Sequence, residues 1–385
     1  MEIAEKMLLK LVRSQVFDYE LDKDFKNNLT TENIEKIWNL SGMHSLASVV
    51  SSAFVDNNLC TDVIKTFFST EVYRFMCESE RQDYELKKIC DVLNNSNIFH
   101  IPLKGSVIKK LYPQSWMRTS CDIDILVHEN ELERTVNLLE NELSYTYESK
   151  GLHDISMLTP SNVHVELHYL LIEENRLKSN ILQDVWSYVT VVPDSKYTML
   201  MTDEMFYFYH IAHMAKHFKS NGFGIRHLID LWILNHKIEF ERNKREHLLK
   251  KGNLLKFEQA VYHLCEVLFD DATSDDKTDM FIDYIFNSGT YGSLYNDIAL
   301  KRMNDRKSKL VYYFNRIFMP CRELIILYPS LKSKQWLYPY YLLRRWLRIL
   351  FYKNHKRLVA ELQSNSALNG RKMKIFEEIY NSLDL

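Results

Sequence analysis

RTSCDIDILV, residues 118–127, alternates two aspartates with isoleucines and then becomes an apolar run. This alternation predicts a β-strand, in which Asp122 and Asp124 share one face about 7 Å apart while Ile123 and Ile125 point into a core. Two carboxylates held side by side on a rigid strand repel each other. We expect a divalent cation, or a pair of them, to offset this repulsion by binding between the carboxylates and the phosphates of a substrate.

The composition of the whole chain favours helices around this strand. Its 385 residues are 46% hydrophobic, which is typical of a globular protein, and the length indicates two or three subdomains. Only 9 glycines and 7 prolines occur, so we expect few tight turns and many long helices. The predicted fold class is therefore α+β and predominantly helical, with one small mixed sheet.

Changes in periodicity divide the chain into three predicted regions. Apolar residues have helical spacing over 1–95 and again over 173–385, whereas 96–172 has the pattern of a small α/β core. Within this core, short strand-like runs enclose two helical segments. The helical segments are near 106–111 and 129–141, and the strand-like runs are 98–103, 122–127, 144–148, 154–158 and 163–171.

Charge, cysteine content and hydropathy exclude several classes of protein. A net charge of -2 and a pI near 6.7 provide no global attraction to nucleic acid, so no DNA partner is expected. The six cysteines contain no CxxC pair, which favours reduced thiols. The sequence starts without a signal-peptide pattern, and no run of about 18 apolar residues predicts a transmembrane segment. These features together predict a cytoplasmic protein.

One local cluster of positive charge lies near the C-terminus. Its members are Arg344, Arg345, Arg348, Lys353, Lys356 and Arg357. A solvated helix face is the default interpretation. The alternative is that residues 344–357 meet nucleic acid, another polyanionic acceptor or an acidic membrane surface.

A candidate phosphate-binding turn precedes the aspartate strand. Lys104, Gly105 and Ser106 follow directly on an apolar strand and come before a predicted helix. Glycine lets the backbone approach a phosphate, the helix N-terminus supplies free N–H groups, and Lys104 can neutralise phosphate charge. The alternative is a purely structural glycine between a strand and a helix.

A third acidic residue follows the aspartate strand, in VHVELHY at residues 163–169. The same alternation places His164, Glu166 and His168 on one face of a strand. If this strand pairs beside residues 122–124, three carboxylates converge, as a two-metal site for phosphoryl or nucleotidyl transfer requires. Glu166 would then complete the site and act as a general base. The alternative is an amphipathic strand whose polar face meets solvent.

Two arginines are further candidates for nucleotide binding. Arg118 can bind a phosphate oxygen in a fork geometry, or it can form a surface salt bridge or an ion pair with one of the metal-binding acids. Arg226 lies four residues before Asp230, the spacing of an intrahelical ion pair, which is our favoured interpretation and is compatible with Arg226 facing a nucleotide.

His210, His213 and His217 are spaced to share one face of a helix. This spacing suggests zinc, but the adjacent acid of a motif such as HExxH is missing, which disfavours a metal site. A position of His213 and His217 at the border of the active-site cleft, as hydrogen-bonding or acid/base groups, is more plausible than a metal site. The default interpretation is a satisfied role in the core or on the surface.

The sequence resembles the nucleotidyltransferase superfamily, and within it a bacterial group of uncharacterised nucleotidyltransferases often encoded beside genes for polysaccharide or natural-product synthesis. The motifs that carry the resemblance are IPLKGS at 101–106, the segment from Leu111 through Arg118 to Val127, and VELH at 165–168. His213, His217, Arg226 and Asp230 resemble the second signature of that group. The resemblance implies that the Gly-Ser turn cradles phosphates and that the Asp-x-Asp pair and a third acid bind magnesium.

These observations lead to one main hypothesis for the function. An enzyme using Mg²⁺, expected as two ions with Mn²⁺ as a possible substitute, would move a nucleoside monophosphate from an NTP, with ATP as the expected donor. The acceptor would be a hydroxyl or phosphate of a small molecule, a glycan precursor or a peptide. The alternatives are nucleotidylation of a protein or tRNA, and a catalytically silent nucleotide-binding module.

Overall fold

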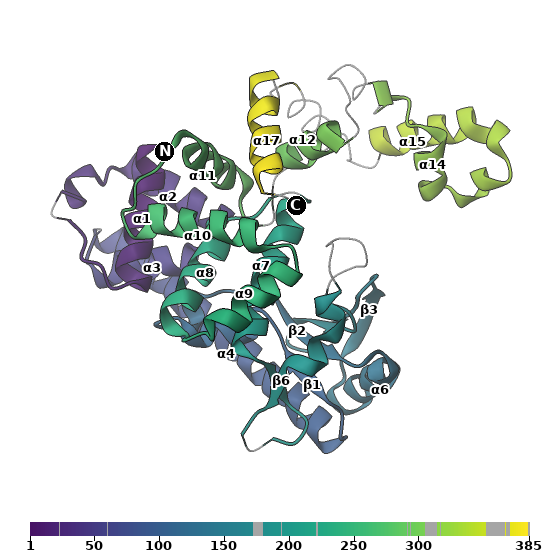
Figure 1. The fold of residues 1–385 in the computed structure, drawn as a ribbon, viewed down its shortest axis with the longest axis horizontal. Coiled ribbons are helices and arrows are strands. Elements are labelled where there is room, and N and C mark those ends of the chain that lie inside the picture. Colours follow the sequence, from purple (N-terminus) through teal and green to yellow (C-terminus); the bar gives the residue numbers. More distant parts are fainter. Residues whose placement is uncertain are drawn as a thin grey trace. The chain divides into compact units, whose positions relative to one another are not determined.

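The computed structural model describes residues 1–22, 24–59, 61–171, 180–193, 195–220, 222–290, 292, 294–304, 314–315, 317–351, 366 and 370–383. The chain forms two compact units. One unit contains Met1–Lys216, Phe223–Thr290 and Leu383–Leu385, and the other contains His217–Gly222 and Tyr291–Ser382. The fold is α+β and predominantly helical, with a small mixed sheet, which confirms the predicted class (Figure 1).

In the described residues before the sheet, the α-helices are α1 (Ile3–Val16), α2 (Thr31–Met43), α3 (Ala47–Asp56) and the long α4 (Asp62–Asn95). In α1 and α2 the buried residues recur mostly at helical spacing, so each of these helices buries one face, whereas α3 is buried on all sides from Ser48 to Phe54. Thr30 caps α2, because its side chain accepts a hydrogen bond from the backbone N–H of Asn33 at 3.2 Å.

The sheet has five strands in the spatial order β1-β2-β5-β4-β3. They are β1 (His100–Pro102), β2 (Asp122–Val127), β3 (Thr146–Lys150), β4 (Asp154–Leu158) and β5 (His164–His168). β2 and β5 are parallel, and the other neighbouring pairs are antiparallel. All five strands overlap the runs that alternation predicts.

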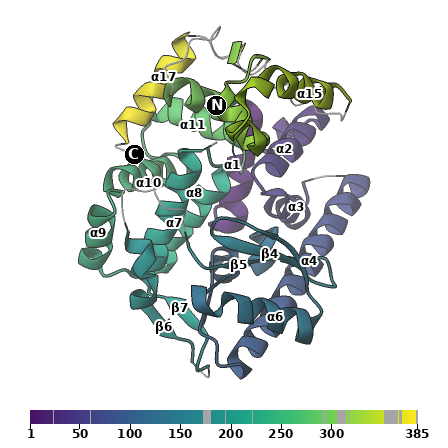
Figure 2. The same cartoon turned by 90° about the vertical axis from the view of Figure 1, so that its right-hand side faces the viewer.

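One face of the sheet packs against α4 and α6 (Leu132–Leu143) (Figure 2). Ile123 and Ile125 of β2 and Val165 and Leu167 of β5 are almost fully buried in this layer. The alternating acidic and histidine side chains of the same strands therefore point to the opposite face.

The connections differ in detail from the predicted helices. The segment predicted near 106–111 consists of the short helix α5 (Gly105–Ile108) followed by the 3₁₀ turn Lys109–Leu111. A 3₁₀ turn, Glu129–Glu131, also precedes α6. Between β1 and β2, the 3₁₀ turn Lys109–Leu111 is followed by another, Ser115–Met117, which ends just before Arg118.

After the sheet, a 3₁₀ segment (Ile181–Tyr188) leads into a two-stranded hairpin of β6 (Val189–Val191) and β7 (Met199–Met201). The sequence pattern predicts only helices after residue 172, which is wrong for this hairpin, because three-residue strands are too short for alternation to be recognised. The helices that follow in this unit are α7 (Asp203–Phe218), α8 (Ile225–Lys237), α9 (Arg242–Lys251), α10 (Leu255–Phe269) and α11 (Asp276–Ser288). The last two residues of α7 lie beyond Lys216, where this stretch of the first unit ends. Ten consecutive residues of α8, from Ile225 to Leu234, are buried.

The second unit contains α12 (Leu294–Asn304), α14 (Cys321–Leu327), α15 (Tyr338–Phe351) and α17 (Gly370–Ser382). Of the C-terminal basic cluster, Arg344, Arg345 and Arg348 lie on α15, whereas Lys353, Lys356 and Arg357 lie outside the described residues. Among the helices that are described, none combines the length and the apolar character needed to cross a bilayer.

Candidate active site

The predicted juxtaposition of the acidic residues is present in the register of β2 and β5. Asp122 lies opposite His164 and Asp124 lies opposite Glu166 in this parallel pair. The short distance between parallel strands, about 4.8 Å, brings the side chains of opposite residues together on one face. The second acidic position therefore adjoins the first, as the main hypothesis requires.

Asp124 is the centre of the cluster. Its Oδ1 atom accepts a hydrogen bond from Lys104 Nζ at 2.7 Å and lies 2.7 Å from His168 Nε2. His168 Nε2 is also 3.3 Å from Glu166 Oε2. Asp124 and His168 are almost fully buried, whereas the Glu166 side chain is 31% exposed and so remains accessible to a substrate.

The electrostatics of the cluster favour a bound cation. Burial alone would raise the pKa of Asp124, but the positive charge of Lys104 and the hydrogen bond from His168 hold it well below its usual range. Burial, together with repulsion by Asp124, raises the pKa of Asp122. Lys104 offsets this repulsion only in part, so added positive charge would stabilise both carboxylates in their ionised form.

The donor atoms also fit a divalent cation. Ligand atoms of Asp124, Glu166 and His168 all lie within 4.8 Å of one another, and Asp122 is not a member of this group. In the described part of the chain, the hydrogen bonds and ion pairs of the Asp124 carboxylate use Oδ1, which leaves Oδ2 for a metal. Carboxylate oxygens are the ligands that Mg²⁺ prefers.

The predicted phosphate turn has an unusual backbone at Lys104. Lys104 has φ 43° and ψ -118°, and the turn is closed by a hydrogen bond from Ser106 N–H to Leu103 C=O at 3.2 Å. Residues other than glycine rarely adopt such angles, and strain of this kind is often found at functional sites. The lysine is held in this conformation beside Asp124.

Gly105 has a packing role in this turn. A Cβ atom at Gly105 would lie 3.1 Å from Ser120 Oγ and 3.2 Å from Arg118 Nη1. The glycine therefore allows the turn to lie against the segment that leads into β2. Because Ser106 N–H already closes the turn, its hydroxyl is the group that remains for a phosphate.

Arg118 is engaged in a buried ion pair with Asp230 of α8. Its Nη2 donates to Asp230 Oδ2 at 2.9 Å, and Tyr112 Oη donates to Asp230 Oδ1 at 2.7 Å. This pairing differs from the alternatives considered for Arg118 and from the intrahelical pair favoured for Asp230. The two partners are 112 positions apart in the sequence, so their spacing contains no signal of the contact.

Both arginines bind the same carbonyl. Arg118 Nη1 and Arg226 Nη1 donate to Thr119 C=O at 2.9 Å and 3.1 Å. This carbonyl lies three residues before Asp122. The arginines therefore connect α8 to the start of the aspartate strand.

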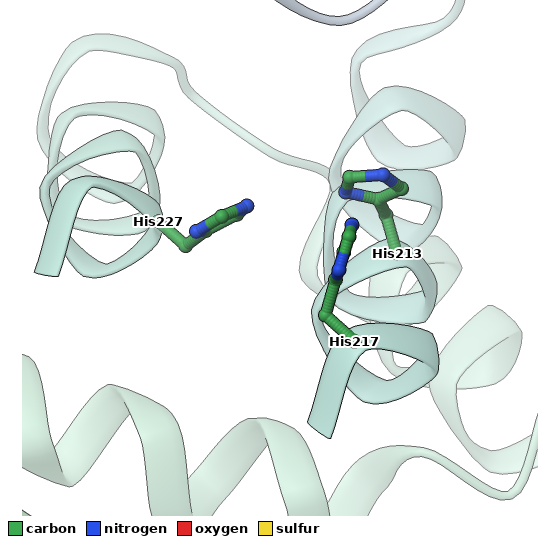
Figure 3. A group of neighbouring side chains, drawn as sticks. All are labelled: His213, His217 and His227. Atoms are coloured by element: carbon green, nitrogen blue, oxygen red, sulfur yellow. The ribbon is translucent and has the colours of Figure 1, made fainter. Parts of the chain in front are cut away.

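The histidines of α7 form a different group from the predicted one. The His227 ring of α8 points toward the helix that carries His213 and His217 (Figure 3). One ligand atom of each residue lies within 4.8 Å of those of the other two. His210 is not in this group, and its Nε2 lies 3.1 Å from the backbone carbonyl of His227. His227 follows Arg226 directly, but only the packing of α7 and α8 places it beside the other two.

Two further residues, His168 and Tyr209, lie at the acidic cluster without a local sequence signal of their contacts. His168 was placed on the correct face of its strand, yet its contacts with Asp124 and Glu166 depend on the sheet register. Tyr209 of α7 is fully buried, and its pKa is raised by burial and by the nearby acids Asp124 and Glu166, in opposition to Lys104. A hydrophobic-looking aromatic residue on a helix provides no local signal of such a position.

A family model described as "Uncharacterised nucleotidyltransferase" matches residues 30–270, which is more than half of the chain. The chain belongs to this family. The matched region contains β2, β5, α7 and α8, and so includes the whole acidic cluster and both arginines. No curated protein matches the chain. Membership supports nucleotidyl transfer as the general reaction class and an NTP as a substrate.

Proposed function

We propose that this protein is a Mg²⁺-dependent enzyme that transfers a nucleoside monophosphate from an NTP, with ATP as the expected donor. The acceptor is a hydroxyl or phosphate group on a small molecule, a glycan precursor or a peptide. The observation that carries the proposal is the register of the parallel strands, which places Glu166 beside Asp124 on the face opposite the core.

The three acids have separate roles in this proposal. Asp122 and Asp124 would hold the metal ions, and Glu166 would complete the site. When bound, Mg²⁺ would neutralise charge on the transferred phosphate and orient its oxygens. The partly exposed Glu166 would take the proton from the acceptor hydroxyl as the new phosphorus–oxygen bond forms and pyrophosphate leaves.

The neighbouring residues would orient these carboxylates and bind the phosphates of the substrate. His168 bridges Asp124 and Glu166, and so fixes the orientation of both carboxylates. Lys104 would pass from Asp124 to the phosphates when the metal binds, because the cation then neutralises the aspartate. Gly105 and Ser106 complete the phosphate side of the site. Because Arg118 is bound to Asp230, we assign it a structural role beside the turn at Gly105 and not direct binding of the nucleotide.

The proposal is tested with α-labelled and γ-labelled NTPs, Mg²⁺ and a cell extract as the source of acceptors. We expect transfer of the α-label by the wild type and by Asp91→Asn, which changes an exposed aspartate on α4. Asp124→Asn and Glu166→Gln should abolish this transfer while the proteins remain folded by circular dichroism.

Two results would contradict the proposal. Transfer of the γ-label alone would indicate a kinase. Equal α-label transfer by the wild type and Asp124→Asn would mean that the acidic cluster is not the catalytic centre. Mass measurement of the labelled product would then identify the class of acceptor and distinguish small molecules from protein or tRNA.

A further inference from the structure

Three histidines converge at a place separate from the carboxylates of the sheet. His213 and His217 are one turn apart on α7, which continues as a single helix to Phe218, and His227 is in the first turn of α8. One ring nitrogen of each histidine lies within 4.8 Å of those of the other two (Figure 3). His227 is buried, and His213 and His217 are partly exposed. The rings of His213 and His227 have centroids 6.0 Å apart.

The donor atoms distinguish this group from the acidic cluster. Three imidazole nitrogens suit Zn²⁺ and related transition metals, whereas the carboxylates of the sheet suit Mg²⁺. A pair of histidines at i and i+4 on a helix, completed by a third from another element, is a recurring geometry of zinc sites. The HExxH glutamate provides a catalytic base in metalloproteases rather than a metal ligand, so its absence does not weaken the ligand set.

We infer that His213, His217 and His227 bind a single Zn²⁺ ion through their imidazole nitrogens. A tetrahedral zinc ion holds such nitrogens about 3.3 Å apart, so rotation of the rings would bring the three ligands to binding distance. Three protein ligands leave the fourth coordination position for an oxygen ligand such as water or a phosphate oxygen. The ion binds independently of the Mg²⁺ at the acidic residues.

The position of the group on α7 relates it to the rest of the site. Tyr209, His213 and His217 follow one another at intervals of four residues and so lie along one side of the helix. The hydroxyl of Tyr209 is close enough to Asp124 and Glu166 for their charges to raise its pKa further, beyond the effect of burial. A zinc ion at the histidines would therefore lie along the helix that borders the acidic cluster.

The experiment measures metal content and affinity rather than activity. The full chain is stripped with a chelator, reloaded with Zn²⁺ in the presence of excess Mg²⁺, desalted and analysed by elemental mass spectrometry. We expect one zinc per chain, and visible absorption bands of tetrahedral Co²⁺ when cobalt replaces zinc. Competition with a chromogenic chelator then measures the affinity.

Matched variants locate the ion. His213→Ala and His217→Ala should each weaken zinc binding at least about 100-fold, because loss of even an outer-shell partner costs about 10–100-fold. Both partly exposed positions are chosen because the buried His227 is more sensitive to substitution. His247→Ala, at an exposed histidine of α9, should bind zinc as the wild type does.

Two outcomes would overturn the inference. One is substoichiometric zinc in the wild type after reloading. The other is unchanged affinity in His213→Ala and His217→Ala, with folding confirmed by circular dichroism. Asp124→Asn provides the remaining comparison: loss of zinc in that variant alone would place the ion at the acidic cluster instead. Because the readout is metal content, failure of the proposed nucleotidyl transfer would leave this result unaffected.

Discussion

Acidification should destabilise the fold through His44, a fully buried histidine at the end of α2. Its Nε2–H donates to Phe286 C=O at 3.2 Å, and its Nδ1 accepts a hydrogen bond from Ile225 N–H at 3.3 Å. This pair of contacts requires the neutral ring, because a proton on Nδ1 would face another N–H group. Ile225 begins α8, so the imidazole connects α2 to the helix that carries Arg226 and Asp230.

The size of the effect follows from the shift of the His44 pKa. Burial lowers this pKa from 6.5 to about 4. Between these values the unfolded chain binds a proton that the folded protein does not, so the free energy of unfolding falls as the pH falls. The contribution of the neutral His44 ring to the free energy of unfolding is fully present above about pH 6.5. This contribution decreases by about 3 kcal/mol by about pH 4, since each pKa unit corresponds to about 1.4 kcal/mol.

The measurement is urea unfolding of the wild type and His44→Gln at several values from about pH 7 to about pH 4. Glutamine can keep the donor to Phe286 but does not titrate. The difference in stability between the two proteins should therefore shrink by about 3 kcal/mol on acidification, whereas His247→Gln, at an exposed histidine, should follow the wild type. A difference that stays constant with pH would show that the buried His44 does not have the lowered pKa described here.

Three other substitutions test the structure around the site. In chemical denaturation, Arg118→Met should lower the free energy of unfolding by about 3–5 kcal/mol, because Asp230 is left buried without its cation. The double variant Arg118→Met with Asp230→Leu should lose less stability than the sum of the two single changes. In the same assay, Gly224→Ala should destabilise the protein by about 1–3 kcal/mol, since the added Cβ would lie 2.7 Å from a backbone nitrogen. The control Gly42→Ala, which has open space around it, should be neutral or slightly stabilising. Lys104→Gly should be more stable than Lys104→Ala by about 1–3 kcal/mol, because only glycine adopts φ 43° without strain. Equal thermal unfolding midpoints of the two variants would contradict a strained backbone at residue 104.

The sheet and its acidic face were predictable because their signals are local. In a strand, the alternation of Asp122, Ile123, Asp124 and Ile125 decides which side chains face the core without reference to any other segment. The same alternation around Glu166 placed it on the correct face. The hairpin of β6 and β7 was missed because three-residue strands offer too few positions for a period to be detected.

The contacts between distant segments were not predictable in this way. Asp230 was assigned to Arg226 from helical spacing, whereas the structure pairs it with Arg118, 112 positions away. His227 joins His213 and His217 only because α8 packs beside α7. Helical periodicity defines the face on which a residue lies but contains no information about which other helix that face meets.

The local sequence pattern indicates the acidic strand, the position of Glu166 on a second strand and the class of reaction that such residues catalyse. The groups that surround Asp124 depend on the packing of the folded chain: Lys104 comes from the strained turn and His168 from β5. Alternation is a property of neighbouring residues and survives in any fold. The pairing of β2 with β5 depends on the path of the chain between them, and it is this pairing that turns separate acidic residues into one site.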